Sequence, residues 1–261
     1  MSERIAKKQG SVLKTLSCIL LSACIGGAAG YGSSYLAKNL WTVQSSLEKP
    51  ALTELGNYYS LYSTYQLLNN EKANQDPTGD IFNRFKQLAG SYEHAKVFWE
   101  NTDYYKQKLT DDSQHDSQLL DQLSREIKLL DTNAATTQLS LELDNPKRAR
   151  ELLTEYIDYT GLANRKNIYG ELIVKWKTLF DQVNSAANLN VADTERQKWK
   201  SMLSMMQSVK PLDDQLVSYH FIQKPGQAEI SSPNRIYWAG IGSAIGAFFG
   251  LFIGLFIRRK Y

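Results

Sequence analysis

Cysteine is nearly absent from this chain of 261 residues. The two cysteines, Cys18 and Cys24, lie six residues apart in one apolar stretch, and so on different faces of a helix. Residues 38–235 contain none. Whatever fold this central part adopts must therefore be held together by packing rather than by disulfide bonds.

The motifs of common catalytic and cofactor sites are also missing. The three histidines lie far apart and form no H-x-x-x-H pair, and there is no G-x-S-x-G elbow and no Walker A loop. Gly240-x-Gly242 lies inside an apolar run with no strand before it, so it does not predict dinucleotide binding. Acidic pairs such as Asp213-Asp214 are typical of solvated loops. We expect no enzyme, no metal site and no cofactor.

Two stretches of 22 residues, 16–37 and 236–257, lack any charged side chain. As helices each would be about 33 Å long, which is enough to cross a bilayer core. Tyr237 and Trp238 stand at one end of the second stretch, where amphipathic rings prefer the membrane interface. The sequence therefore predicts one transmembrane helix near each end of the chain.

The basic residues flank both stretches on the side of the chain termini. They are Arg4, Lys7, Lys8 and Lys14 before the first stretch, and Arg258, Arg259 and Lys260 after the second. By the positive-inside rule both termini face the cytoplasm. The prediction is a cytoplasmic tail (1–15), a span (16–37), a periplasmic domain (38–235), a second span (236–257) and a second tail (258–261), in the inner membrane of a Gram-negative cell. Residues 38–235 hold more acidic than basic residues, which argues against a nucleic-acid partner.

The N-terminus has one rival interpretation. Leu21-Ser22-Ala23-Cys24 has the form of a lipoprotein cleavage site after a basic segment. Against it, the apolar stretch continues well beyond Cys24, and a second span would make a lipid anchor redundant.

The central part predicts an α+β fold. Alternation predicts strands over 41–47, over 137–143 and at Val217, Tyr219 and Phe221. Helical periodicity predicts a helix over 52–68, a helix capped by Asp80 that runs to about Leu109, and a further apolar stripe at Leu119, Leu123, Ile127 and Leu130. A long helix follows Pro146, with a break predicted at residues 188–190. The first and last strands could pair near the membrane, with the long helix projecting away.

Glycines recur on one face of each predicted span. Gly242, Gly246, Gly250 and Gly254 are spaced by four, and Gly26-x-x-x-Gly30 offers a matching site. In lipid, small residues at this spacing let helices approach closely. Glycine is also simply common in membrane helices. We interpret the ladder as a packing face, with the other span or another copy as its partner.

Several runs of residues resemble a known family, the Wzz-type polysaccharide co-polymerases or chain-length determinants, and within it the branch for enterobacterial common antigen. The runs are Trp41 leading to Lys49-Pro50, then Leu55-Gly56-Asn57-Tyr58-Tyr59, then the ten residues from Phe98-Trp99 through Asp103-Tyr104-Tyr105 to Gln107, and last the segment from Tyr219 to Pro225. The chain departs from the family in a shorter middle and in a proline segment with only Pro225 and Pro233.

The resemblance implies a non-enzymatic protein that forms a ring-like homo-oligomer on the periplasmic face of the inner membrane. It would act with a separate polymerase on repeats carried by undecaprenyl diphosphate and set the length of the glycan. It supplies no catalytic residue. Alternatives are a capsule or exopolysaccharide co-polymerase or export component, which normally needs a kinase domain or a partner kinase, and a periplasmic sensor or tether, which should continue into a cytoplasmic domain. A periplasmic hydrolase with an unrecognised site is a third.

Overall fold

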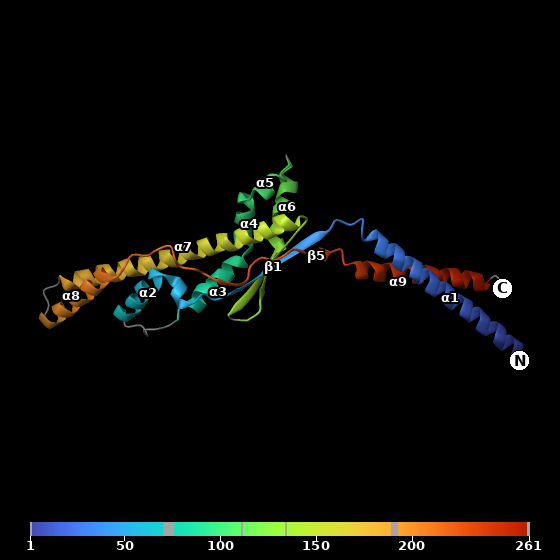
Figure 1. Cartoon of the computed structure of the whole chain (residues 1–261), viewed down its shortest axis with the longest axis horizontal. Helices are drawn as coiled ribbons and strands as arrows, with labels where there is room; N and C mark the ends of the chain where they lie inside the picture. Colours follow the sequence, from blue (N-terminus) through green and yellow to red (C-terminus); the bar gives the residue numbers. More distant parts are fainter. Residues whose placement is uncertain (1, 70–75, 111, 134, 189–192, 260–261) are drawn as a thin grey trace. The chain divides into compact units, whose positions relative to one another are not determined.

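The computed structural model describes residues 2–69, 76–110, 112–133, 135–188 and 193–259. The chain divides into two compact units (Figure 1). The terminal unit comprises Met1–Thr42, Leu143–Pro146 and Glu229–Tyr261, and the central unit comprises Val43–Glu142 and Lys147–Ala228.

The terminal unit is built on two long helices, α1 (Ser2–Ser33) and α9 (Arg235–Arg259). Both are long and apolar enough to cross a membrane, over Leu16–Ser33 and Arg235–Gly254. Helix α1 thus ends four residues before the predicted end of the first span at residue 37. A short strand, β5 (Glu229–Ser232), leads into α9 and pairs with the first residues of β1 (Leu40–Glu48).

The strands follow the order β2-β3-β1-β4, with β2 (Ile127–Asp131), β3 (Thr136–Leu143) and β4 (His220–Gln223). The paired strands β2 and β3, and likewise β1 and β4, run antiparallel. Alternate residues of β3 and β1 are buried, as the period of two requires, among them Leu139, Leu141, Val43 and Leu47. The predicted pairing of the first and last strands is confirmed, since β1 pairs with both β4 and β5.

Helices complete the central unit. They are η1 (Leu52–Leu55), α2 (Asn57–Leu68), α3 (Thr78–Ala89), α4 (Tyr92–Asn101), α5 (Asp103–Lys106), α6 (Ser113–Glu126), α7 (Pro146–Ala187) and α8 (Asp193–Ser208). The predicted long helix is α7, whose 42 residues span about 63 Å. One apolar cluster joins α7 to α2 and α3, and a second joins it to α2 and α8. Of the predicted break, residues 189 and 190 lie outside the described residues.

Two local helix predictions were wrong. Asp80 lies inside α3, and Asp76 instead accepts hydrogen bonds from the backbone N–H (2.9 Å) and hydroxyl (2.6 Å) of Thr78. The helix predicted to reach Leu109 is divided into α3, α4 and α5. The divisions fall where Ser91 and Thr102 accept hydrogen bonds from backbone N–H groups and so start new helices. Side-chain capping favoured these interruptions over one continuous helix.

The strand predictions also need two corrections. Ile127 and Leu130 belong to β2, because the apolar residues that continue the α6 stripe also fit a short strand that can pair with β3. Val217 and Tyr219 precede β4, which starts at His220, and β5 is a further strand that the alternation did not predict. Backbone pairing with β1 determines where β4 and β5 begin and end. The alternation of residues within one segment does not show which other strand it will pair with.

Gly56 separates η1 from α2 in a conformation that only glycine adopts readily, with φ 56° and ψ −144°. A Cβ there would lie 2.8 Å from the Cβ of Gln215 and against the Asp213 carboxylate, which accepts a hydrogen bond from the Asn57 N–H. This explains why a helix predicted over 52–68 is interrupted at this position.

We expect Gly56→Ala to lower the free energy of unfolding by about 1–3 kcal/mol, because it combines backbone strain with this close contact. Thermal unfolding of the purified chain in detergent measures the effect. Gly170→Ala is the matched control, since Gly170 lies in α7 with nothing near its missing Cβ, and alanine is the better helix former. An unchanged or raised Tm for Gly56→Ala would contradict the assignment of strain.

Candidate functional site

The two terminal helices meet along their glycines. A Cβ built on Gly246 would lie 3.1 Å from the Cα of Gly26, and one on Gly242 would lie 3.0 Å from the Cα of Gly30. Gly250 faces Ile19, and Gly254 is buried in α9. The structure thus brings the predicted ladder and Gly26-x-x-x-Gly30 together in an antiparallel seam within one chain. Contact this close leaves no room for any side chain larger than hydrogen.

The faces of these helices opposite the seam are apolar and exposed. Ile25 is 62% exposed on α1, and Phe248 is 61% exposed on α9. At the end of the pair away from the chain termini, the Arg235 guanidinium lies 4.2 Å from the Tyr35 ring centroid and donates a hydrogen bond to its hydroxyl at 3.0 Å. An apolar girdle that ends in aromatic and basic side chains is the pattern of a membrane-spanning pair.

The residues that carry the family resemblance are dispersed through the fold. Trp99 is fully buried, with Phe98 and Tyr104 as ring neighbours. Asp103 and Tyr105 belong to the short helix α5, and the Tyr105 hydroxyl donates to the backbone of Asp116. This run forms a packed corner between α4 and α6. Of the others, Trp41 lies in β1, Pro50 is buried after it, Tyr59 lies in α2, and Pro225 follows β4.

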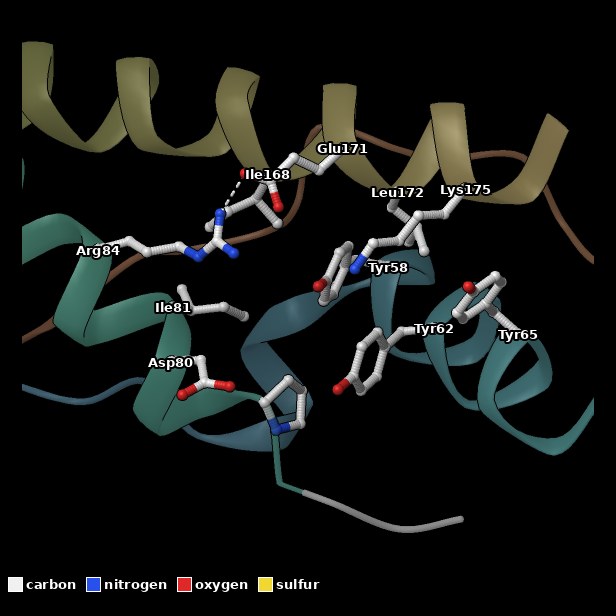
Figure 2. A pocket seen from close by; sticks show the side chains of 11 residues that line it. Tyr58, Tyr62, Tyr65, Asp80, Ile81, Arg84, Ile168, Glu171, Leu172 and Lys175 are labelled. Carbon is white, nitrogen blue, oxygen red and sulfur yellow. Dashed lines mark hydrogen bonds and ion pairs between the residues drawn. The ribbon is translucent and has the colours of Figure 1, made fainter. Parts of the chain in front are cut away.

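Tyr58 lies at a cavity of about 130 Å³ between α2, α3 and α7 (Figure 2). Tyr58, Tyr62 and Tyr65 line it from one helix face, and Arg84 and Glu171 form an ion pair across it. The spacing of these tyrosines was visible in the sequence. Arg84 and Glu171 were not predicted, because nothing in the sequence shows that α3 and α7 lie together.

The rings and the ion pair at this cavity contact other side chains of the central unit. The Tyr58 ring stacks on Tyr62 at 5.7 Å and on Tyr169 at 6.1 Å. Burial raises the pKa of the Tyr58 hydroxyl, so it stays protonated. The hydrogen bond from Arg84 lowers the pKa of the Glu171 carboxyl, which therefore stays ionised. The cavity is small, and its tyrosine rings and its ion pair contact one another, which suits a structural contact between helices better than a ligand site.

Within the described ranges, no group of three or more His, Cys, Asp or Glu side chains is placed to hold a metal ion. His94 Nε2 lies 3.1 Å from the Thr160 hydroxyl, and burial lowers the pKa of His94. His220 Nδ1 lies 3.0 Å from a Glu54 carboxylate oxygen, and His115 is in the first turn of α6. These histidines are held in three separate environments.

Sequence comparison relates the chain to proteins that modulate glycan length. No protein-family model matches it. It is 25% identical over 154 residues to the ECA polysaccharide chain length modulation protein of Salmonella typhimurium, and 26% identical over 151 residues to that of Escherichia coli K12. Each match covers 55% of this chain and 43% of the relative, so it spans less than half the length of these curated relatives.

Structural comparison extends the likeness to nearly the whole chain. A full-length bacterial polysaccharide co-polymerase matches with a TM-score of 0.65 at 12% identity, and 97% of each chain is covered. A fragment of the co-polymerase WzzB from Salmonella Typhimurium matches with a TM-score of 0.52 at 14% identity, over 74% of this chain and all of the fragment. The predicted α+β fold, with apolar terminal helices and a long helix, is confirmed.

Proposed function

We propose that this chain, a member of the Wzz family of polysaccharide co-polymerases, sets the length of a bacterial surface glycan without forming or breaking a glycosidic bond. The proposal is supported by the agreement of two comparisons. The fold matches that of a polysaccharide co-polymerase from the first helix to the last, and the sequence is related to chain-length modulators.

The substrate and partners follow from this role. The glycan is of the enterobacterial common antigen or O-antigen type, built from repeats carried on a lipid diphosphate. A separate polymerase of the inner membrane joins the repeats, and this chain acts on it as a homo-oligomer. A glycan-length profile of cells that lack the gene tests the proposal, because polymer should persist with a changed length distribution.

We further propose that α1 and α9 cross the inner membrane, that both termini are cytoplasmic, and that the central unit is periplasmic. Three observations support this arrangement. The two helices are antiparallel, so the start of α1 and the end of α9 lie at the same end of the pair (Figure 1). Their outward faces are apolar. Basic residues flank each helix on the terminal side. Helix α1 also continues for nine residues beyond Cys24, which favours a span over a lipidated N-terminus.

Reporter fusions at each terminus test this topology. We expect green fluorescent protein, which fluoresces when folded in the cytoplasm, to be active at both ends. Alkaline phosphatase, which needs the oxidising periplasm, should be inactive at both ends and active when inserted after Lys210, an exposed residue that follows α8. Phosphatase activity at either terminus would contradict the arrangement.

A further inference from the structure

A second cavity of the central unit opens between the first half of α7 and the segment that leads into β4. Its volume is about 690 Å³, within the range of about 300–1,000 Å³ that small-molecule sites occupy. Arg165, Tyr219, Phe221 and Lys224 are among the residues that line it. Unlike the cavity at Tyr58, it is large enough to receive a sugar ring.

Two aromatic rings give this cavity a fixed apolar wall. Tyr219 rests on the helix at Gly161, where a Cβ would come within 2.9 Å of its ring, and its hydroxyl donates to Asp158 at 2.8 Å. Burial and the Asp158 carboxylate raise the pKa of Tyr219, so this donor is retained. Phe221 stands edge-on to Tyr219 at 5.1 Å and is half-buried. A half-exposed ring held by its neighbours can receive the apolar face of a sugar.

The carboxylates of the cavity are engaged within the protein. One Glu54 oxygen lies 3.0 Å from His220 Nδ1, and the other accepts the Ala51 N–H at 2.8 Å. Asp158 accepts the Tyr219 hydroxyl. These acids therefore already have donors, and each is fixed by the contact it makes.

The two cations are placed differently. Arg165 donates through Nε to the Leu216 carbonyl at 2.9 Å, which holds its guanidinium in place and leaves the terminal nitrogens as donors. The Lys224 ammonium lies 5.9 Å from the Phe221 ring centroid. Neither Arg165 nor Lys224 forms an ion pair within the part of the chain that the structure describes. Both are available to an anion in the cavity.

We propose that this cavity binds an acidic sugar residue of the glycan, with the sugar ring against Phe221 and its acidic group toward Arg165 and Lys224. The proposal rests on the proposed function, which supplies the glycan, and it adds the chemical class of the unit recognised. A guanidinium fixed by Nε suits a planar carboxylate, while the second cation adds charge complementarity. Contact with one acidic sugar would let the protein bind a growing glycan without catalysing a reaction on it.

Binding of an oligogalacturonate to the purified full chain in detergent, measured by calorimetry, tests the site. We expect Arg165→Gln and Lys224→Gln each to weaken binding about tenfold, the typical effect of losing one charge-assisted contact. Lys166→Gln is the matched control, because Lys166 is an exposed cation beside Arg165 on α7 that does not line the cavity. A neutral maltooligosaccharide of equal length should bind at least tenfold more weakly than the oligogalacturonate.

Other outcomes would overturn the site. Equal binding of the acidic and neutral oligosaccharides would remove the role of the cations. Variants that change the oligomer size but leave binding intact would mark the cavity as an interface between copies. Lys224→Gln keeps the test decisive if Arg165→Gln fails to fold, since Lys224 is exposed. If the purified chain binds no acidic glycan while gene deletion still changes glycan length, the site is wrong and the proposed function stands.

Discussion

Gly246→Leu should separate the two terminal helices and weaken assembly of the protein. A leucine there would need space that the backbone of Ser22 and Gly26 occupies, and neither helix can yield without losing contacts along the seam. Overpacking of this kind costs about 1–3 kcal/mol in well-packed cores, and backbone contact leaves less room for relief than a side chain would. We expect a lower Tm in detergent and a smaller yield of crosslinked oligomer.

Two controls separate the seam from general effects of the substitution. Gly240→Leu makes the same change on α9 at a position with nothing near the missing Cβ. Phe248→Leu alters the outward face of the same helix, where the side chain is exposed. Both variants should keep the Tm and the oligomer yield close to those of the parent chain. If Gly246→Leu and Gly240→Leu lowered the Tm and the oligomer yield equally, the argument for the glycine seam would fail.

The sequence was sufficient for features that depend on period and length. Two uncharged runs predicted α1 and α9, alternation predicted β1 and β3, and a stretch without proline after Pro146 predicted α7. Each signal is local, because the periodicity of a helix or a strand can be read from the residues of that element alone. The four-residue spacing of the glycines predicted a packing face in the same way, but it left open whether the partner was the other span or another copy.

Features that depend on contact with another segment of the chain could not be predicted from the sequence. β5 has four residues and is defined by its pairing with β1. The division of the helix after Thr78 depends on capping by Ser91 and Thr102, which compete with helical periodicity. The cavity at Tyr219 combines residues from α7 with residues more than 50 positions later, so no spacing in the sequence indicates it. The family resemblance pointed to motifs, and the structure buries four of their residues, Pro50, Tyr58, Trp99 and Tyr105.

Loss of this protein should change the length of a surface glycan without abolishing the polymer. A polymerase and a length modulator fail differently when they are removed. Without the polymerase only single repeat units remain, because no bond between repeats can form. Without the modulator the repeats are still joined, but no assembly limits or extends the chain, so the length distribution broadens or shifts. A variant that folds but does not assemble should produce a profile that resembles the deletion.

The most direct test of this account is the glycan-length profile on a gel of cells with and without the gene, with the amount of polymerase measured in both. The account predicts polymer in both strains, a narrow preferred length only where the protein is present, and restoration of that length by the parent gene. Complete loss of polymer in the deletion strain, at an unchanged level of polymerase, would contradict it, because the protein would then take part in forming the bond itself.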